Sequence, residues 1–410
     1  MTTPFSVDKD APHRRCLVGN EPVILHCHHF NTYLQQTLLD AEYIDTTKIL
    51  IGAANEMAFH QLSDIFSRQD TADVAERKEL ASRLYQWAGF GKIDLSLLKK
   101  DGGTLATRQS HYSQAWKVKL GKATRPVDFF TAGWLTGALS AVYGLAQDEF
   151  SVIQEKCMAK GDEQNVFSLT PGGNNYSVYH SAKGGELAAQ VLQETTSPLD
   201  EDAIFDALQG LPLVGDDQTG LIEAFGVILT HHYANYYNRI SFEFERELAA
   251  QFGTDGMEIA EPLLVESGHV CAFNTFGGIM KSMMWQGLIQ PQLATKEDWV
   301  HGIIACVYAL GWGRWQAVGI SRDEARFVIH NDYESIGFRA MYGKADHNIS
   351  YLAMGSAMGI MDLVYVGNIE EHPELNPAFY EKLFKGKESY QAKVVKSLAM
   401  GDPYTEIHVF

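Results

Sequence analysis

The sequence predicts an α+β protein that contains two diverged copies of one domain, each with helices packed on an antiparallel sheet. Two observations predict this class. Short motifs recur in the same order in the two halves of the 410-residue chain, and in each half helical periodicity gives way to strand-like runs and a hairpin. We therefore divide the chain into an N-terminal extension (1–19), copy one (20–172), a helical connector (173–258) and copy two (259–410).

The repeated motifs begin with HCHHFNT at residues 26–32, which returns as HVCAFNT at residues 269–275. Further matches follow in the same order: GFGK (89–92) with GWGR (311–314), Tyr112 with Tyr333, Gly121-Lys122 with Gly343-Lys344, GWLTG (133–137) with GSAMG (355–359), and KGD (160–162) with MGD (400–402). One shared dipeptide would be chance, whereas six blocks in one order indicate a duplication.

The elements of each copy follow from periodicity. Apolar residues recur at helical spacing over 30–45, 48–68 and 73–90 in copy one, and over 274–289 and 296–311 in copy two. The next segments, 104–120 and 325–342, are strand-like, and the glycine-spaced segments 129–143 and 351–366 are predicted helices that let another backbone approach closely. A hairpin turning at Gly-Asp closes each copy: 150–158 with 166–169, and 391–398 with 405–410.

The connector carries helical patterns throughout. Two short ones cover 186–194 and 200–208, and a long aromatic one covers 221–252. The long helix is too apolar to stand in solvent, so we expect it to pack between or across the two copies.

Composition excludes several classes of function. The chain has 33 Lys and Arg against 51 Asp and Glu, a net charge of −18, which repels phosphate backbones and excludes nucleic acid as a partner. No apolar run is long enough to span a membrane, and the N-terminus lacks the apolar core of a signal peptide. The five cysteines are scattered and form no CxxC pair, which indicates reduced thiols and a cytoplasmic protein.

The end of each copy resembles the 4-vinyl-reductase-like domain, also called the hydrocarbon-binding family. The residues that carry this resemblance are FFTAGWLTGALSAVYG (129–144) with QEKCMAKGD (154–162), and in copy two 354–367 with VKSLAMGD (395–402). The resemblance implies four helices beside an antiparallel sheet, an internal pocket for a small apolar or aromatic molecule, and two-fold pairing of domains. Both copies share one chain here, so the pairing would be an intramolecular pseudo-dimer; a homodimer of whole chains stays open.

The same resemblance argues against a zinc site. Phenol-sensing members of the family hold zinc with a Glu and a Cys on the first hairpin strand and a second Cys on the next. The matching residues here are Gln154, Cys157 and Asn165 in copy one, and Val394, Ser397 and Thr405 in copy two. Because a structural zinc needs about four ligands, that site is predicted to be lost and Cys157 to be a small buried residue.

A different metal site is predicted in copy one. The segment His26-Cys27-His28-His29 is dense in donor atoms, and Glu56, His60 and Asp64 stack four residues apart on one helical face. His26 or His28 with Glu56 and His60 would suit non-haem iron, zinc or manganese. The alternative is that His26, which His269 repeats, is structural and the others are polar surface residues.

A second pair of histidines lies in the connector. His231 and His232 point about 100° apart on a helix, so one of them could line a pocket with Tyr236. An axial haem ligand is less favoured because no CxxCH motif occurs, and no glycine-rich phosphate motif for NAD or flavin is present.

Two functions follow, and whether the protein is an enzyme stays open. The first is binding of a small apolar or aromatic molecule, with His26, His28, His232 and Tyr236 as ligand-binding residues. The alternative is a metal-dependent oxidoreductase that acts on such a molecule through His26, His28, Glu56 and His60. The family name also suggests reduction of a vinyl group, but that is analogy at the level of the fold.

Overall fold

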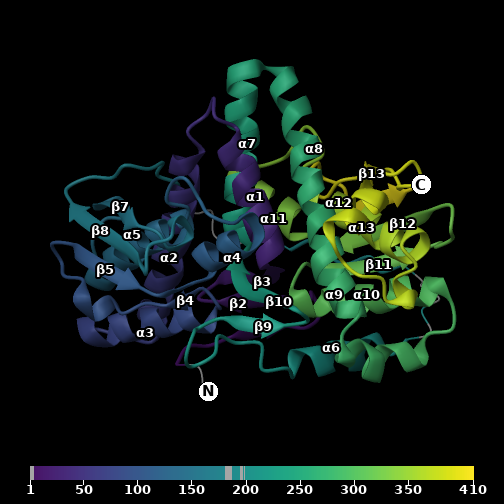
Figure 1. Cartoon of the computed structure of the whole chain (residues 1–410), viewed down its shortest axis with the longest axis horizontal. Helices are drawn as coiled ribbons and strands as arrows, with labels where there is room; N and C mark the ends of the chain where they lie inside the picture. The colour runs from purple at the N-terminus through teal and green to yellow at the C-terminus, as the bar shows by residue number, and fades with distance from the viewer. Residues whose placement is uncertain (1–3, 181–186, 194–196, 198) are drawn as a thin grey trace.

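A five-stranded antiparallel sheet at the centre of the molecule joins the two halves of the chain (Figure 1). This is a computed structural model, and it describes residues 4–180, 187–193, 197 and 199–410. The strand order is β1-β2-β3-β10-β9, with bounds β1 (Asp8–Asp10), β2 (Arg15–Val18), β3 (Glu21–Cys27), β9 (Ile222–Ala224) and β10 (Val227–Tyr233). Leu25 of β3 lies directly opposite His231 of β10, so residues far apart in sequence meet at this seam.

The first half of the chain extends from the middle of Figure 1 to its left side. Its helices are α1 (His28–Asp40), α2 (Thr46–Arg68), α3 (Val74–Trp87), α4 (His111–Leu120) and α5 (Phe129–Tyr143). A three-stranded antiparallel sheet in the order β5-β8-β7 accompanies them, with β5 (Gly103–Thr107), β7 (Phe150–Lys156) and β8 (Asn165–Pro171), beside the short pair β4 (Gly91–Lys92) and β6 (Gln109–Ser110).

The second half has a similar order of elements, and its four-stranded sheet lies on the right side of Figure 1. Its helices are α7 (Ala234–Phe252), α8 (Thr254–Cys271), α9 (Gly277–Met280), α10 (Lys296–Leu310), α11 (Tyr333–Tyr342), α12 (Tyr351–Met361) and α13 (Pro377–Phe384). The sheet has the order β11-β12-β14-β13, with β11 (Arg314–Val318), β12 (Ala325–His330), β13 (Ala392–Lys396) and β14 (Thr405–Val409). The predicted α+β class, helices with antiparallel sheets, is confirmed.

The glycines of the predicted close-packed helices meet other backbones, as expected. A Cβ atom at Gly133 of α5 would lie 2.0 Å from the carbonyl oxygen of Ile51 in α2. In the second half, a Cβ at Gly355 of α12 would lie 2.0 Å from the carbonyl oxygen of Val265 in α8. Only glycine lets these helix pairs approach so closely.

Two predicted strands are wrong in their second halves. Residues 111–120 and 333–342 form the helices α4 and α11 instead of continuing the strands before them. The side chains of Ser110 and Asp332 accept a backbone N–H of the first turn in each helix and so fix where it starts.

The connector is not wholly helical. The predicted helix over 221–252 is confirmed only as α7 (Ala234–Phe252); residues 222–224 and 227–233 form β9 and β10 instead, because β10 pairs with β3 there. Of the predicted helix 186–194, residues 187–193 are irregular, and 186 and 194 lie outside the described residues. The prediction over 200–208 is confirmed as α6 (Glu201–Gln209).

Within the described part of the chain, no helix has the length and apolar character needed to span a membrane.

Candidate functional site

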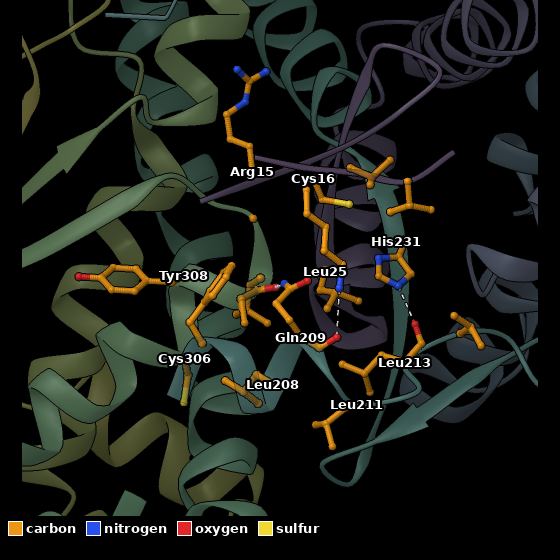
Figure 2. A pocket seen from close by; sticks show the side chains of 18 of the residues that line it. Arg15, Cys16, Leu25, Leu208, Gln209, Leu211, Leu213, His231, Cys306 and Tyr308 are labelled. Carbon is orange, nitrogen blue, oxygen red and sulfur yellow. Dashed lines mark hydrogen bonds between the residues drawn. The ribbon is translucent and has the colours of Figure 1, made fainter. Parts of the chain in front are cut away.

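A cavity of about 220 Å³ lies on one face of the central sheet, where the two halves of the chain meet (Figure 2). On the side of the sheet, the cavity is lined by Val23 and Leu25 of β3 and by His231 of β10. The walls are apolar side chains from α6, α9 and α10, among them Phe205, Leu208, Ile279 and Cys306. No Asp or Glu occurs among the described residues that line it.

His231 is the most informative polar group of this cavity. Its Nε2–H donates to the carbonyl oxygen of Leu213 at 2.6 Å, and its ring stacks on Trp87 with centroids 4.4 Å apart. Burial lowers the pKa of His231 to about 4, so the ring is neutral near pH 7. With the proton on Nε2, Nδ1 keeps its lone pair, and Figure 2 shows that nitrogen on the side of the ring facing Leu25.

Two further polar groups stand near the edge of the cavity. Lys9 and Cys16 lie directly opposite each other on β1 and β2. The Nζ of Lys9 donates to the carbonyl oxygen of Gln209 at the end of α6, 3.2 Å away. Burial raises the pKa of the Cys16 thiol to about 11, so it stays protonated. The lining is therefore mainly apolar, with the neutral acceptor His231 on the sheet side and the cationic residues Lys9 and Arg15 also among the lining residues.

The predicted ligand-binding pair His232 and Tyr236 lies on the opposite face of the sheet. Because residues alternate along a strand, His232 points away from the face that His231 lines. The structure brings the two predicted residues together, with ring centroids 4.7 Å apart, and the hydroxyl of Tyr112 lies 2.8 Å from Nε2 of His232. His232 belongs to β10 and not to a helix, and both residues are buried outside the cavity lining.

His26 and His28 do not share one face, because β3 ends at Cys27 and α1 begins at His28. His26 is fully buried and its ring stacks between Phe30 and Trp312, with centroids 4.1 and 4.7 Å away. The Nδ1 atom of His28 accepts the backbone N–H of Ile228 at 3.1 Å. Burial lowers the pKa of both rings, and neither residue lines the cavity.

The carboxylate of the predicted metal site is already paired. Glu56 is fully buried, and its two oxygens accept bonds of 2.8 and 2.9 Å from the guanidinium of Arg239 in α7. Asp64 pairs with Arg68 at 2.7 Å, and Nε2 of His60 has no hydrogen-bond partner among the described residues.

His26, His28, Glu56 and His60 therefore do not assemble into one ligand set. Among the residues that the structure describes, no three His, Cys, Asp or Glu side chains form a group that could hold a metal ion. The residues present do not fit the predicted centre, since its one carboxylate is engaged by a guanidinium. Bound metal stays a prediction that elemental analysis of the purified protein tests.

Hydrogen-bonded aspartates occupy the region where the family resemblance places zinc. In the first half, Asp128 Oδ2 accepts from Ser110 at 2.6 Å and from Asn165 at 2.9 Å. In the second half, Asp332 Oδ2 accepts from Ser350 at 2.9 Å and from Thr405 at 2.7 Å. Cys157 is fully buried beside this cluster, as expected of a small buried residue.

Sequence reasoning named the pair His231 and His232 but chose His232 as the ligand-binding residue, and it missed Trp87 and Cys306. One signal was available: in the run Val227–Tyr233, alternate residues Leu229 and His231 share a face if the segment is a strand. The helical interpretation of that segment hid this pattern. Trp87 and Cys306 come from separate helices, and nothing in their spacing indicates that they meet.

Comparison with known proteins gives little guidance. No protein-family model matches the chain, and no curated protein matches it. Among solved structures, it is similar to the phenol-responsive sensory domain of the transcription activator PoxR, determined with phenol. That match has 16% sequence identity and a TM-score of 0.33, and covers 46% of this chain and 80% of the other. At this TM-score the likeness carries no structural or functional argument.

Proposed function

We propose that this protein binds a small, mainly apolar molecule of the size of one aromatic ring in the cavity at the seam of its two halves. The observation that carries the proposal is the cavity itself, which is lined mainly by apolar side chains and contains an oriented acceptor, Nδ1 of His231. An apolar cavity of on the order of 150 Å³ is large enough to take benzene, so about 220 Å³ admits a substituted ring.

The polar group of the ligand follows from the charge state of His231. A neutral imidazole whose Nε2–H is engaged can only accept at Nδ1, so the ligand should carry an O–H or N–H donor. Phenols and small aromatic alcohols combine the required apolar body with the required donor.

Isothermal titration calorimetry with para-cresol and toluene tests this proposal. The two molecules have similar shape, but only para-cresol carries a hydroxyl donor. We expect para-cresol to bind about 3- to 10-fold more tightly, the value of one net hydrogen bond. His231→Phe should remove this difference while still allowing toluene to bind, because the ring stack on Trp87 is kept.

A variant that fills the cavity tests whether the ligand binds there. Val23→Phe adds a ring on the sheet side of the cavity. Because this ring fills the space, the variant should bind neither molecule. Val118→Phe adds the same ring at a residue of α4 that is 72% exposed, and should leave binding unchanged. If neither molecule binds at millimolar concentration, or if Val23→Phe binds as the parent does, the proposed function is wrong.

We also propose that the two halves are diverged copies of a 4-vinyl-reductase-like domain paired within one chain. Matching contacts support this. The N–H groups of Cys157 and Ser397 both bond, at 2.8 Å, an aspartate five residues later. The capping residues Ser110 and Asp128 of the first half correspond to Asp332 and Ser350, with serine and aspartate exchanged. On this proposal β9 and β10 belong to the second copy, which then begins near residue 221.

A further inference from the structure

We propose that one face of the second-half sheet binds an extended, acidic peptide of another protein, in place of the chain's own segment 187–193. This clamp face consists of Arg314 and Gln316 of β11, His330 of β12 and Asn331, which follows β12. Arg314 lies directly opposite His330, and alternate residues of a strand share a face, so Gln316 points to the same side as both. All four residues lie outside the lining of the cavity.

Two buried amide side chains hold the segment by its main chain. Oδ1 of Asn331 accepts the N–H of Ala188 at 2.9 Å, and Nδ2 donates to the carbonyl oxygen of Ala188 at 3.3 Å. Gln316 makes the same pair of bonds with the N–H and carbonyl oxygen of Gln193, both at 2.9 Å. Because every residue except proline carries both backbone groups, these amides recognise an extended chain whatever its side chains are.

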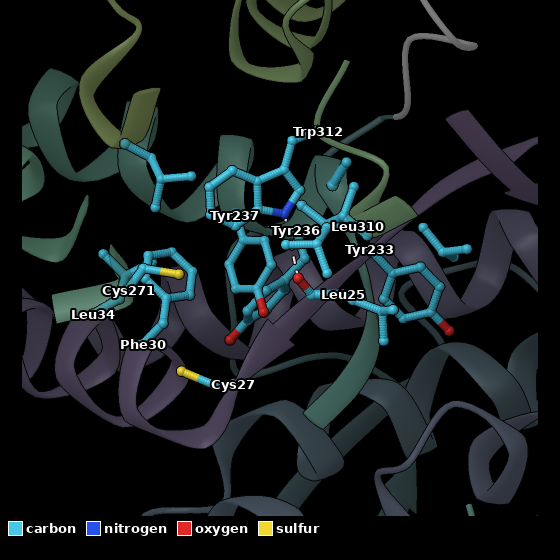
Figure 3. Close-up of a cluster of buried hydrophobic side chains, with 14 of the residues drawn as sticks. Leu25, Cys27, Phe30, Leu34, Tyr233, Tyr236, Tyr237, Cys271, Leu310 and Trp312 are labelled. Atoms are coloured by element: carbon cyan, nitrogen blue, oxygen red, sulfur yellow. Dashed lines mark hydrogen bonds between the residues drawn. The ribbon is translucent and has the colours of Figure 1, made fainter. Parts of the chain in front are cut away.

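The clamp face is fixed to the core of the molecule. Trp312, two residues before β11, is buried, and its Nε1–H donates to the carbonyl oxygen of Leu25 in β3 at 3.3 Å (Figure 3). Its ring also lies against Phe276, with centroids 5.3 Å apart. The segment 187–193, in contrast, forms neither helix nor strand. The surface is therefore rigid, and the segment is the part that can be exchanged.

The chain's own segment fits this surface poorly. Its sequence, Leu-Ala-Ala-Gln-Val-Leu-Gln, consists mainly of good helix formers, yet the clamp face holds it in an irregular conformation. In that conformation Val191 and Leu192 are 53% and 48% exposed, so two neighbouring apolar side chains stay in water. These side chains add little to binding, and a peptide whose side chains contact the face would displace the segment.

The groups between the two amides indicate an acidic partner. Arg314 and His330 lie between Gln316 and Asn331 along the strands. Nε of Arg314 and both ring nitrogens of His330 are buried without a hydrogen-bond partner among the described residues. Burial lowers the pKa of His330 to about 4, so the neutral ring keeps one N–H donor. Residues 189–192 contain no carboxylate, whereas Asp or Glu at this place would accept from both side chains.

Fluorescence anisotropy with synthetic peptides tests the proposal. The double variant Ala188→Pro/Gln193→Pro removes the two N–H groups that the amides accept, so the segment should leave the face. The probes are a labelled peptide with the sequence of 187–193 and relatives with one Glu at each position that matches 189–192. We expect the variant to bind the first peptide about tenfold or more tightly than the native protein does. One Glu peptide should bind about tenfold or more tightly still, as a charge-assisted bond gives.

Further variants assign the binding to named groups. In the double variant, Gln316→Leu should abolish binding of every peptide, and Arg314→Met should remove only the gain from Glu. Val191→Pro is the matched control, because it adds the same ring at a residue that neither amide holds, and it should bind peptides as weakly as the native protein.

Hydrogen exchange on the native protein gives the answer without any variant. An excess of the tightest Glu peptide should speed exchange of the N–H groups of Ala188 and Gln193 and leave β11 and β12 unchanged. Unchanged exchange at both N–H groups, with no peptide bound by a folded double variant, would overturn the proposal. Equal affinity for all peptides would overturn the acidic class of partner. A native dimer in light scattering whose exchange ignores the peptides would assign the face to a second copy of the chain instead.

Discussion

Burial decides the charge of the side chains on which the proposed site depends. The clearest cases are His231, held neutral with a pKa of about 4, and the Cys16 thiol, kept protonated by a pKa of about 11. The neutral side chains of His231 and Cys16 favour an apolar ligand with a single hydrogen bond over a ligand whose charge would lie beside them. The same physics acts on Glu21, a buried carboxyl of the central sheet whose Oε1 has no partner among the described residues.

Glu21 predicts a pH dependence of stability. Burial, and next the charge of Glu56, raise its pKa to about 8, well above the value of about 4.3 in an unfolded chain. The folded state thus holds a proton that the unfolded state releases, and the resulting stabilisation is lost as pH rises through 8. We expect the free energy of unfolding in urea to fall by up to about 1.4 kcal/mol per pH unit between about pH 5 and pH 8. Glu21→Gln should flatten this slope, and an unchanged slope would contradict the prediction.

The spacing of residues in the sequence predicted which side chains lie together on one helix. It did not predict which side chains from other elements contact them. Glu56, His60 and Asp64 do lie four residues apart on α2, as predicted. The residue that determines the chemistry of Glu56 is Arg239, which is far away in sequence and lies on α7. No local pattern reveals that pairing, so the predicted metal ligands and the observed ion pair are equally consistent with the sequence around Glu56.

Helix packing at glycines explains how the elements come close enough to form the core. Sequence alone predicted the helix 129–143 with its observed bounds, because glycine spacing and apolar periodicity act locally. It failed over 111–120 and 222–233, where a capping side chain and pairing with a distant strand decide the conformation. Periodicity mispredicts a segment when its conformation depends on contacts with residues elsewhere in the chain.

The close contact between α2 and α5 predicts a specific sensitivity to alanine. Gly133→Ala would raise helix propensity by about 1 kcal/mol, yet its Cβ would lie 2.0 Å from the carbonyl oxygen of Ile51. We expect a net destabilisation of about 1–3 kcal/mol in chemical denaturation, since the two backbones must separate. Gly287→Ala is the matched control, because no atom lies within 4 Å of its added Cβ. Equal stability of the two variants would show that the contact is not close-packed.

Buried contacts join the first half of the chain to the second half. The pairing of β3 with β10, the buried Glu56–Arg239 pair and the contact of His26 with Cys271 all join the first half to the second. We therefore expect calorimetric unfolding as one cooperative transition, with equal calorimetric and van't Hoff enthalpies. Two resolved transitions would mean that the halves are independent, and the cavity between them would then be weakly formed.

Motif order and periodicity predicted the α+β class and led to the proposed repeat, but the cavity does not follow from either. It forms where β3, β10, α6 and α10 converge, and α6 comes from the connector, for which the sequence offers no repeat partner.

The central claim is that this space holds a small apolar molecule. A crystal of the protein soaked with para-bromophenol tests it directly, because bromine is located by its anomalous scattering. We predict one bromine site enclosed by Val23, Leu25 and Cys306, with the phenol oxygen at Nδ1 of His231. An empty cavity, or bromine bound only elsewhere, would contradict that claim.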